Sequence, residues 1–398
     1  MRKSALFLFG LVVASLVALG LVVLSSASEA NGLRLYNDPY FFMKRQFAFL
    51  FLGIFVATGA ALFDYRRWRD HKFLPVLAYA GVLVLLLLVF GYRAVNGSQR
   101  WIILGPIRVQ PSEFAKLVTV IVTAVWMDRA GWHAEQFKRG ALCPAILIAI
   151  LCGPVLFQPD FGSVMVMGAS GLLVMFVAGT RVLHLLPVVS MGVLVFIYKL
   201  VTNANRMRRL MGYFSSHGQT AASSPSVVEQ VVTNVTAAVH ELDPAAYQAQ
   251  MSRVAIQNGG VFGVGLGESM QKHLYLPEAH TDFIFSVGAE ELGVFFSLVV
   301  IGLFVMFFVL SIYVARKSAD RFGRYLVMGM MFIIFFQASF NLGVVCEALP
   351  TKGMALPFFS YGGTNLLSAF FAVGTILSVG IHSSKDPKRK LSAKSAER

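Results

Sequence analysis

Long apolar runs separated by short polar segments extend along this chain from one end to the other. Several runs reach the roughly 20 residues that a helix needs to cross the hydrocarbon core of a bilayer, and the period-two alternation of a membrane β-barrel is absent. The pattern therefore predicts an all-α polytopic integral membrane protein with ten transmembrane helices. The predicted spans cover about residues 4–25, 46–63, 73–91, 112–127, 141–157, 163–179, 183–202, 283–314, 325–346 and 358–381.

Positive charges indicate how these helices are oriented. Lys and Arg are concentrated in alternate connections, with four in 66–72, three in 129–139, four in 316–324 and six from Lys385 onward. Because cytoplasmic loops carry an excess of Lys and Arg, both termini are predicted to be cytoplasmic. A single membrane domain then covers 1–398, with a large extracytoplasmic loop at 203–282, between helices seven and eight, and a basic cytoplasmic tail at 383–398.

Composition narrows the classes of function. The 398-residue chain is 57% hydrophobic and only 14% charged, yet its formal net charge is +14. That charge would suit a nucleic acid, but no groove of interleaved aromatic and basic residues accompanies it, so we expect membrane lipids rather than nucleic acid as partners. The three cysteines, Cys143, Cys152 and Cys346, all lie in apolar runs and indicate neither a disulfide framework nor a metal site.

Ionisable residues gather where the long polar loop meets the eighth span. They are Glu278, His280, Asp282, Glu290 and Glu291. Burying such groups unpaired is costly, so an ionisable residue at membrane depth is a candidate functional residue. The alternative is that Thr281 or Asp282 only caps the following helix, where short polar side chains are favoured. The rest of this span, up to Val314, is free of charge, so its first turns are expected to face a polar cavity.

Further polar residues fall in other loops that are predicted to face outward. In Gln110-Pro-Ser-Glu-Phe-Ala-Lys, Glu113 and Lys116 lie three residues apart on one helical face. They form either a simple intrahelical ion pair or a ligand site in which Lys116 contacts an anion and Glu113 orients it. Asp160, in the turn Gln158-Pro-Asp-Phe-Gly, either bonds its own backbone, as Asp in turns often does, or lies on the rim of the same cavity.

Cations and glycines also mark the outward side. Three arginines in 206–209 fit either lipid headgroups or a phosphate-bearing ligand, and Lys352 lies between two prolines in a connection that we expect to be rigid. The segment 257–268 has five glycines in nine positions. Such a segment suits a loop that closely approaches a sugar or pyrophosphate, or a flexible lid.

Together these motifs resemble a known protein family, the shape, elongation, division and sporulation (SEDS) family. The segments that carry the resemblance, in family order, are Gln99-Arg-Trp-Ile, Gln110-Pro-Ser-Glu-Phe-Ala-Lys, Gln158-Pro-Asp-Phe-Gly, Tyr275-Leu-Pro-Glu-Ala-His-Thr-Asp-Phe-Ile-Phe, Glu290-Glu-Leu-Gly, Leu349-Pro-Thr-Lys-Gly and Phe358-Phe-Ser-Tyr-Gly-Gly. The resemblance extends over essentially the whole chain, and the Pro-Thr-Lys-Gly form is most similar to the division-type members. The chain departs from the family pattern at Glu347 and at Thr364-Asn365.

This resemblance implies a peptidoglycan glycosyltransferase at the outer face of the bacterial cytoplasmic membrane, active at the division septum. The implied substrate is lipid II, a disaccharide peptide linked to undecaprenyl pyrophosphate. By position, the resemblance implies that Asp282 is the essential catalytic residue and that Glu113, Lys116 and Asp160 line the central cavity. It also implies a class B penicillin-binding protein as the partner transpeptidase, alongside other division proteins.

Polymerisation requires one group to accept a proton from a sugar hydroxyl and others to hold the charge of a pyrophosphate. Asp282 is the candidate base. The further candidate substrate-binding residues are Arg100, Lys272, Lys352 and Ser360. We expect no organic cofactor, and the spacing neither demands nor excludes a divalent cation, Mg²⁺ or Mn²⁺, between Asp282 and the pyrophosphate.

Two other classes of function stay open at the level of sequence. A transporter that flips the same lipid-linked precursor would also place charges around a membrane cavity. A non-catalytic scaffold would recruit division proteins through the loop 203–245 and the basic tail. The unusual polar residues lie on the outer side only, which favours the enzyme over the transporter, and a scaffold should tolerate Asp282→Asn.

Overall fold

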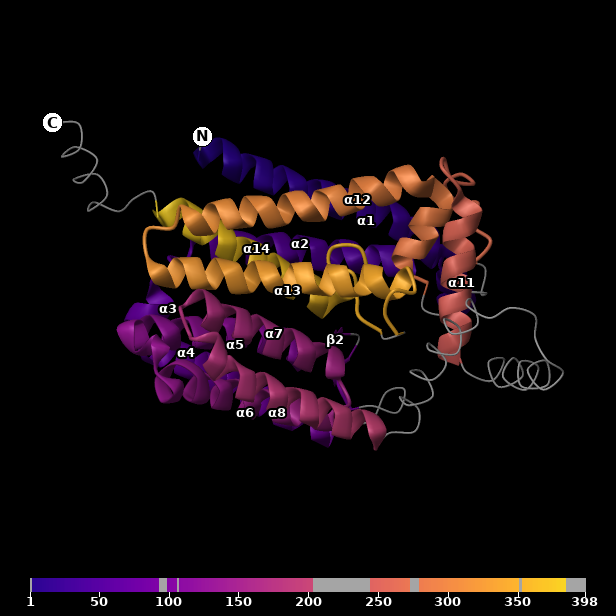
Figure 1. Cartoon of the computed structure of the whole chain (residues 1–398). Helices are drawn as coiled ribbons and strands as arrows, with labels where there is room; N and C mark the ends of the chain where they lie inside the picture. The colour runs from indigo at the N-terminus through magenta and orange to yellow at the C-terminus, as the bar shows by residue number, and fades with distance from the viewer. Residues whose placement is uncertain are drawn as a thin grey trace, which may run out of the picture.

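The computed structural model describes residues 2–92, 99–105, 107–202, 244–272, 279–350 and 353–383. Most of its helices lie side by side along one common axis (Figure 1). The long helices are α1 (Arg2–Tyr36), α2 (Phe41–Leu62), α4 (Phe73–Leu88), α5 (Pro111–Ala130), α6 (Cys143–Phe157), α7 (Phe161–Val177), α8 (Val182–Val201), α12 (Ile284–Arg316), α13 (Arg321–Val345) and α14 (Gly363–His382). The short α3 (Arg67–Asp70) joins α2 to α4, and α11 (Pro244–Gly259) lies across one end of the others.

The lengths and composition of these helices suit a membrane. Within the described residues, eight helices are long and apolar enough to span one. This count takes α4 together with the helical turn that continues it to Gly91, and α6 together with the helical turn that precedes it from Phe137. The two other long helices are α7, which is apolar but only 17 residues long, and α5, whose 20 residues include four charged side chains. Each predicted span coincides with one of these ten helices, and the predicted all-α polytopic membrane fold is confirmed.

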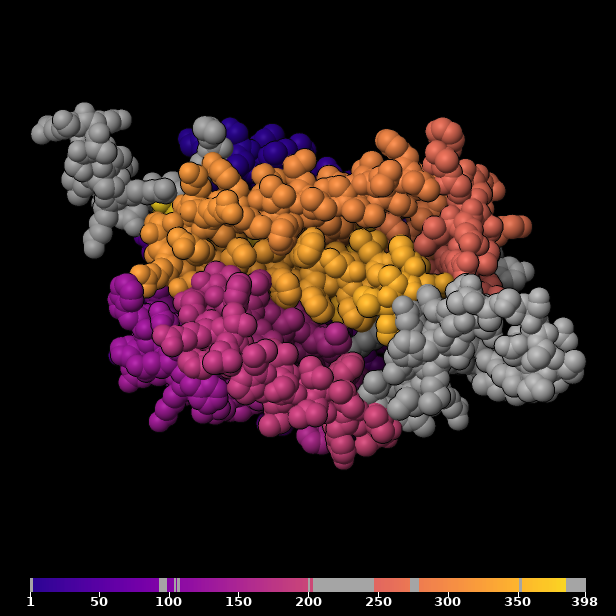
Figure 2. All heavy atoms as spheres, viewed as in Figure 1, coloured from indigo at the N-terminus to yellow at the C-terminus, as the bar shows by residue number. Residues whose placement is uncertain are grey.

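The helices pack as two groups, which Figures 1 and 2 show above and below one another. Helices α1, α2, α12, α13 and α14 contact one another, and so do α4 to α8. The groups meet where α13 and α14 pack against α5 and α7, and Gly329 of α13 allows Val120 of α5 and Val174 of α7 to approach closely. By contrast, nearly the whole surface of α8 is exposed.

Helix α12 is divided at Gly293, whereas the sequence predicts one continuous helix. Gly293 has φ 74° and ψ −168°, a conformation that is essentially restricted to glycine. As a result the segment 284–292 turns away from the axis of 294–316 (Figure 1). The 23 residues after the break, which would extend about 34 Å as a helix, are long enough to cross a bilayer by themselves.

The glycine-rich segment after α11 packs into this break. The backbone N–H of Val294 donates to the carbonyl of Gly260 (3.0 Å), and the N–H of Val264 donates to the carbonyl of Glu290 (3.0 Å). A β-carbon at Gly263 would clash with the carbonyl oxygen of Glu291. At Gly259 and Gly263 the close approach that glycine permits is therefore made to the backbone of α12. The approach to a sugar or pyrophosphate and the flexible lid stay predictions.

A short β-hairpin precedes α5, in a connection for which no strands were predicted. Strands β1 (Ile102–Leu104) and β2 (Ile107–Val109) are antiparallel, with Ile102 opposite Val109. The turn contains Gly105, whose φ of 60° is a conformation that glycine adopts readily in tight turns. Apolar residues on both sides of Gly-Pro were the available signal in the sequence.

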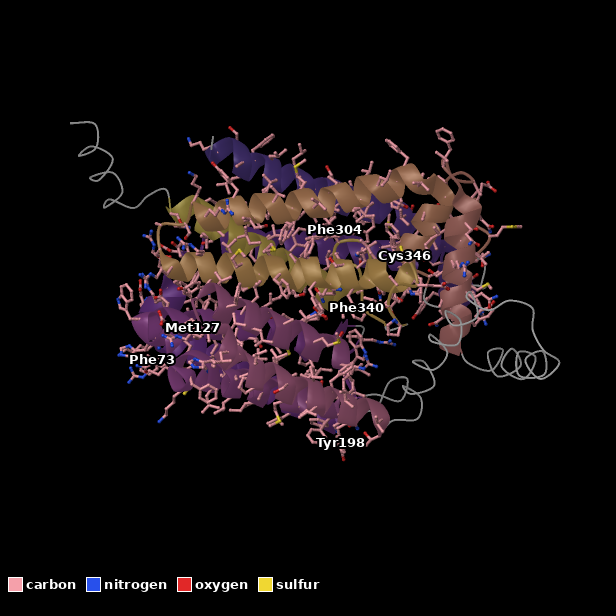
Figure 3. All side chains as sticks on the ribbon, in the orientation of Figure 1. Phe73, Met127, Tyr198, Phe304, Phe340 and Cys346 are labelled. Carbon is pink, nitrogen blue, oxygen red and sulfur yellow. The ribbon has the colours of Figure 1, made fainter. Side chains whose placement is uncertain are left out.

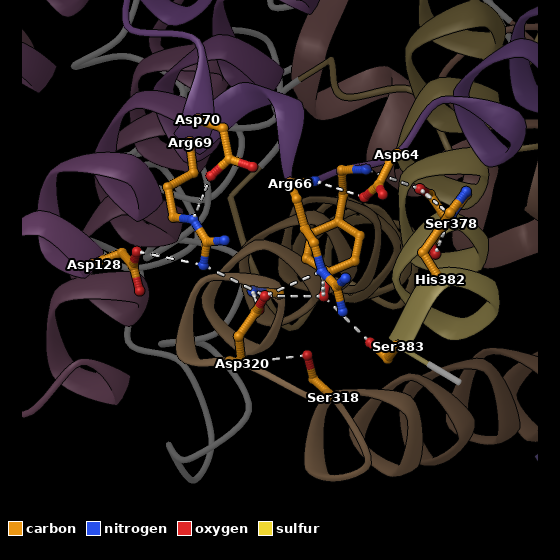
Figure 4. Close-up of polar contacts among 12 residues, drawn as sticks. Asp64, Arg66, Arg69, Asp70, Asp128, Ser318, Asp320, Ser378, His382 and Ser383 are labelled. Carbon is orange, nitrogen blue, oxygen red and sulfur yellow. Dashed lines mark hydrogen bonds and ion pairs between the residues drawn. The ribbon is translucent and has the colours of Figure 1, made fainter. Parts of the chain in front are cut away.

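Charged side chains tie the elements together at the end where the basic connections lie (Figure 4). The carboxylate of Asp320 caps α13 by accepting from the N–H of Gly323 (2.7 Å). It also accepts from the hydroxyl of Tyr65 (3.1 Å) and the guanidinium of Arg69 (3.5 Å), and Arg66 lies 3.6 Å away. Burial raises the pKa of the Tyr65 hydroxyl, so this group stays protonated and able to donate.

Candidate active site

Asp282 lies at the turn that leads into the short first part of α12, and it is half-buried. The N-cap position of α12 is Phe283, and α12 has no side-chain cap. A capping Asp282 would require the helix to begin one residue earlier. The residue at the cap position is thus Phe283, and a capping role of Thr281 or Asp282 stays an alternative.

Polar groups from two distant segments hold the backbone around Asp282. The side-chain amide of Asn341, on α13, donates to the carbonyl oxygens of Asp282 (2.7 Å) and Met354 (2.7 Å). The hydroxyl of Ser360 donates to the carbonyl of Thr281 (2.6 Å) and accepts from the N–H of Leu356 (2.7 Å). The turn that carries Asp282 is thus fixed to α13 and to the segment before α14.

The connection between Pro350 and Pro357 passes directly against the Asp282 carboxylate. A β-carbon at Gly353 would clash with Oδ2 of Asp282, so only glycine permits this approach. Lys352, which the sequence analysis predicts to bind substrate, lies outside the described residues. The sequence nevertheless places it next to the glycine that touches the carboxylate.

A buried ion pair lies on α5. The ammonium of Lys116 donates to Oε1 of Glu113 (2.8 Å), and the side chains are 1% and 7% exposed respectively. The hydroxyl of Ser368, on α14, donates to the other carboxylate oxygen of Glu113 (2.8 Å). The predicted i,i+3 ion pair is present, and α14 holds its carboxylate in place.

Asp160 combines the two interpretations that its sequence left open. It caps α7 by accepting from the N–H of Ser163 (3.3 Å), which is the structural role. Its other oxygen accepts hydrogen bonds from the side chains of Gln110 (2.9 Å), Ser112 (2.9 Å) and Ser163 (2.7 Å). Asp160 therefore joins the start of α7 to the start of α5 in a buried polar cluster.

The start of α14 connects the surroundings of Asp282 with those of Glu113 and Asp160. Its polar side chains are spaced four residues apart. Ser360 supports the Asp282 turn, Thr364 accepts from the N–H of Gln110 (3.3 Å), and Ser368 donates to Glu113. Ser360, just before α14, and Thr364 and Ser368 on α14 thus make hydrogen bonds to both parts of the candidate site.

Lys272 occupies a different environment from the one predicted. Its ammonium donates to the hydroxyl of Ser26 (2.9 Å) and to the carbonyl of Gly267, and it lies 3.4 Å from Oε1 of Glu291. Ser26 also donates to Glu291, whose side chain is completely buried. Since these internal oxygens already bind the ammonium, the structure favours Lys272 as a support for the break in α12 and not as a substrate ligand.

Glu290 has a similar internal role. Its carboxylate accepts from the hydroxyl of Ser269 and from the side-chain amide of Asn258 (3.4 Å). The two adjacent glutamates therefore bind the glycine-rich segment and its neighbours. Both are thus surrounded by polar partners and not by lipid, and the polar cavity predicted beside them stays a prediction.

Two remaining predictions concern Arg100 and a metal ion. Arg100 is half-buried next to the β-hairpin, and its role stays a prediction. In the described part of the chain, no group of three or more His, Cys, Asp or Glu side chains is arranged to hold a metal ion. A divalent cation beside Asp282 therefore stays a prediction as well.

Several supporting residues were missed from the sequence. Asn341, Gln110, Ser112 and Ser368 make the hydrogen bonds described above but were not predicted as site residues. For Ser368 a signal was available, since polar residues recur at four-residue intervals in an otherwise apolar helix. Asn341 gave no such signal, because its partners lie far away in the sequence.

The fold and the motifs agree with those of one protein family. The model of the FtsW, RodA and SpoVE family of cell cycle proteins matches residues 6–385. The chain belongs to this family. This family is the SEDS family, which the sequence motifs of the chain resemble. A SEDS relative from Geobacter metallireducens, named probable peptidoglycan glycosyltransferase FtsW, is 38% identical over 373 residues, covering 93% of this chain and 92% of the relative.

Other SEDS proteins extend the comparison to sequence and structure. A protein of the same name from Coxiella burnetii is 36% identical over 369 residues, covering 92% of this chain and 93% of the relative. A chain from a peptidoglycan synthase complex, described as coordinating polymerization and crosslinking, superposes with a TM-score of 0.69 at 27% identity, covering 96% and 98% of the two chains. The rod shape determining protein RodA of Thermus thermophilus superposes with a TM-score of 0.64 at 25% identity, covering 95% and 97%.

Proposed function

We propose that this SEDS protein is a peptidoglycan glycosyltransferase that polymerises lipid II into glycan strands at the outer face of the cytoplasmic membrane, for septal wall synthesis during division. The relatives named FtsW and the similar chain of a peptidoglycan synthase complex support this activity. The observation in this chain that carries the proposal is the Asp282 turn, which Asn341 and Ser360 fix beside a buried polar network.

In this proposal Asp282 is the general base. Its carboxylate takes the proton of the acceptor sugar hydroxyl while that oxygen bonds to the anomeric carbon of the donor. The bond from that carbon to the lipid pyrophosphate breaks, and the pyrophosphate leaves with the electron pair. Attack from the face opposite the leaving group inverts the anomeric centre, as in inverting sugar transfer. Gly353 keeps the carboxylate accessible from one side because it has no side chain.

The cations of the site balance the charge of the leaving group. Lys352 and Arg100 are proposed to bind the pyrophosphate directly, since charge-assisted hydrogen bonds to phosphate are strong. Lys116 is buried in its pair with Glu113, so we assign it to neutralising and orienting this carboxylate, which Ser368 of α14 also binds. Asp160 and Ser360 are proposed to position the same cavity walls.

The proposed topology has ten spans, with both termini in the cytoplasm and the loop 203–282 outside. The end that carries Arg66, Arg69 and the start of α13 is then cytoplasmic, because basic residues are retained on that side. Asp282 precedes the start of α12, which packs against α11 at the opposite end of the bundle (Figure 1). In this proposal the lipid-linked disaccharide reaches the protein at that end. The proposed partner is a class B penicillin-binding protein, which would crosslink the strands.

The test is polymerisation of purified lipid II by the protein together with its penicillin-binding partner. Wild type is expected to form glycan strands, and Asp282→Asn is expected to lose at least about 100-fold in rate, as positioned bases contribute roughly that much or more. Asp38→Asn is the matched control, because Asp38 is an exposed carboxylate that pairs with Lys44 (2.7 Å). Its rate should equal that of wild type.

Equal amounts of folded protein must be compared, using the thermal midpoint of each variant. Full activity of Asp282→Asn would show that Asp282 is not the base. If wild type makes no strands but moves lipid II across liposomes, the protein is a transporter and the proposal fails.

A further inference from the structure

A hollow of about 530 Å³ lies at the basic end of the molecule, between the end of α5 and the start of α6. We call it the α5–α6 hollow. Its lining residues are Trp126, His133, Gln136, Lys138, Arg139 and Cys143. Figure 3 shows nitrogen-bearing side chains gathered at this end, around Met127 and Phe73. None of these residues takes part in the proposed glycosyl transfer.

The charge of the hollow suits an anion. Lys138 and Arg139 are exposed cations, and none of the six lining residues is acidic. The adjacent carboxylate of Glu135 is already paired with Arg181 (2.8 Å), and Asp128 lies 4.0 Å from Arg69. Guanidinium and ammonium groups that lack an internal acid are suited to phosphate.

The backbone around the hollow is fixed before any ligand binds. The indole N–H of Trp126 donates to the carbonyl of Arg139 (2.9 Å), and the hydroxyl of Thr180 donates to the carbonyl of Gly140 (3.0 Å). The N–H of Gly140 donates to the carbonyl of Gln136 (2.8 Å). Binding would therefore order only side-chain ends, which lowers its entropic cost.

Apolar side chains next to the hollow indicate where its ligand comes from. Trp132 is 86% exposed, and Phe137 and Leu142 are also exposed. The guanidinium of Arg321 lies 5.5 Å from the centre of the Trp132 ring. Exposed tryptophan beside cations is typical of the depth at which lipid headgroups lie. A phosphate-bearing molecule that reaches this place from the lipid is a phospholipid.

We propose that the α5–α6 hollow binds the phosphate headgroup of an anionic phospholipid in the cytoplasmic leaflet. Lys138 and Arg139 hold the phosphate, and His133 and Gln136 donate to oxygens of the headgroup. This site depends on the proposed orientation of the helices but is independent of the chemistry at Asp282. A lipid bound here would add a further link between α5 and α6, beside the hydrogen bond from Trp126 to Arg139.

The test measures retention of lipid by the purified full-length protein in native mass spectrometry, with phosphatidylglycerol and with neutral phosphatidylcholine. Wild type is expected to retain one phosphatidylglycerol in preference to phosphatidylcholine. Lys138→Gln combined with Arg139→Gln should weaken that binding roughly 30-fold, since each cation near an anionic lipid contributes about 1 kcal/mol. The charge-conserving pair Lys138→Arg and Arg139→Lys should restore it.

The control is Arg67→Gln combined with Lys72→Gln, which removes two exposed cations from the same end of the molecule but outside the hollow. Its affinity for phosphatidylglycerol should stay within about twofold of wild type. Equal weakening in both double variants would show that only the net charge of this end matters, and the site would be rejected. Displacement of the lipid by millimolar inorganic phosphate would identify a soluble anion as the ligand and also overturn the proposal.

Discussion

At the scale of single residues, the position of Asp282 depends on groups that lie far from it in the sequence. Asn341, 59 residues away, binds its carbonyl, and Ser360 binds the carbonyl of Thr281 from 79 residues away. Both bind backbone carbonyl oxygens, so neither of these hydrogen bonds uses a carboxylate oxygen of Asp282. Gly353 is the residue whose size decides how close the neighbouring backbone can approach.

Replacing Gly353 with alanine should therefore reduce activity more than stability. The added methyl group would overlap Oδ2 of Asp282 and displace a carboxylate that must meet a sugar hydroxyl. A shift of about 1 Å in a catalytic group can cost roughly 100-fold in rate. We expect a loss of about that size in lipid II polymerisation by Gly353→Ala, with little change in the thermal midpoint.

Gly362→Ala is the matched control for this substitution. It lies in the same connection, and a β-carbon there would meet only Asn365, at the ordinary distance of 3.7 Å. Its activity should be close to that of wild type. Equal activity in Gly353→Ala and Gly362→Ala would show that the contact with Asp282 is unimportant.

At the scale of elements, the break in α12 is the feature that gives the site its shape. The segment 284–292 carries Glu290 and Glu291 into contact with the glycine-rich segment and with α1, because Gly293 redirects the chain. A straight helix would take both carboxylates along the axis of 294–316. The break thus provides buried partners for charges that lipid would not accept.

Gly293→Ala should destabilise the fold, since its backbone conformation is unfavourable for alanine by about 1–3 kcal/mol. A β-carbon would also clash with the carbonyl of Val261. The expected result is a lower thermal midpoint in detergent. Gly302→Ala, in the regular part of α12, has open space around its β-carbon and should instead stabilise by about 0.5–1 kcal/mol. The interpretation of the break fails if both variants shift in the same direction.

Features that depend on a single helix could be predicted from the sequence. The length of the apolar runs located the ten helices that coincide with predicted spans, and the spacing of Glu113 and Lys116 predicted their ion pair. Helix α11, within the predicted loop 203–282, was not predicted. The sequence was uninformative where two segments meet. Glu-Glu-Leu-Gly-Val is compatible with a continuous helix, and nothing local indicates that Lys272 pairs with Glu291. That pairing was therefore missed, and Lys272 was predicted to bind substrate.

At the scale of the whole molecule, one carboxylate connects elements at the basic end. Asp320 binds Tyr65, Arg66 and Arg69, which lie between α2 and α4, while it also caps α13. The hydroxyl of Tyr65 lies 3.3 Å from that of Ser383, directly after α14. This cluster joins the two packed groups of helices at the end opposite to Asp282.

Asp320→Asn should lower the thermal midpoint by the loss of its ion pairs alone, because asparagine caps a helix as well as aspartate does. Hydrogen bonds to charged partners contribute about 1.5–3 kcal/mol each, and the partly exposed position reduces this to about 1–2 kcal/mol in total. Asp70→Asn, at a more exposed carboxylate paired with Arg69 (3.0 Å), is the control and should change stability by less than about 0.5 kcal/mol. Equal effects of the two substitutions on stability would show that Asp320 does not connect these elements.

The division of α12 also bears on how the chain enters a membrane during its synthesis. The insertion machinery recognises apolar length, and residues 294–316 supply it without the two glutamates. Glu290 and Glu291 therefore never have to partition into lipid while the ribosome is still adding residues. They can meet Ser26 of α1 and Ser269, which lies 21 residues before Glu290, because both have already been made. Biogenesis of the membrane span and assembly of the buried charges are separate steps, and Gly293 is the boundary between them.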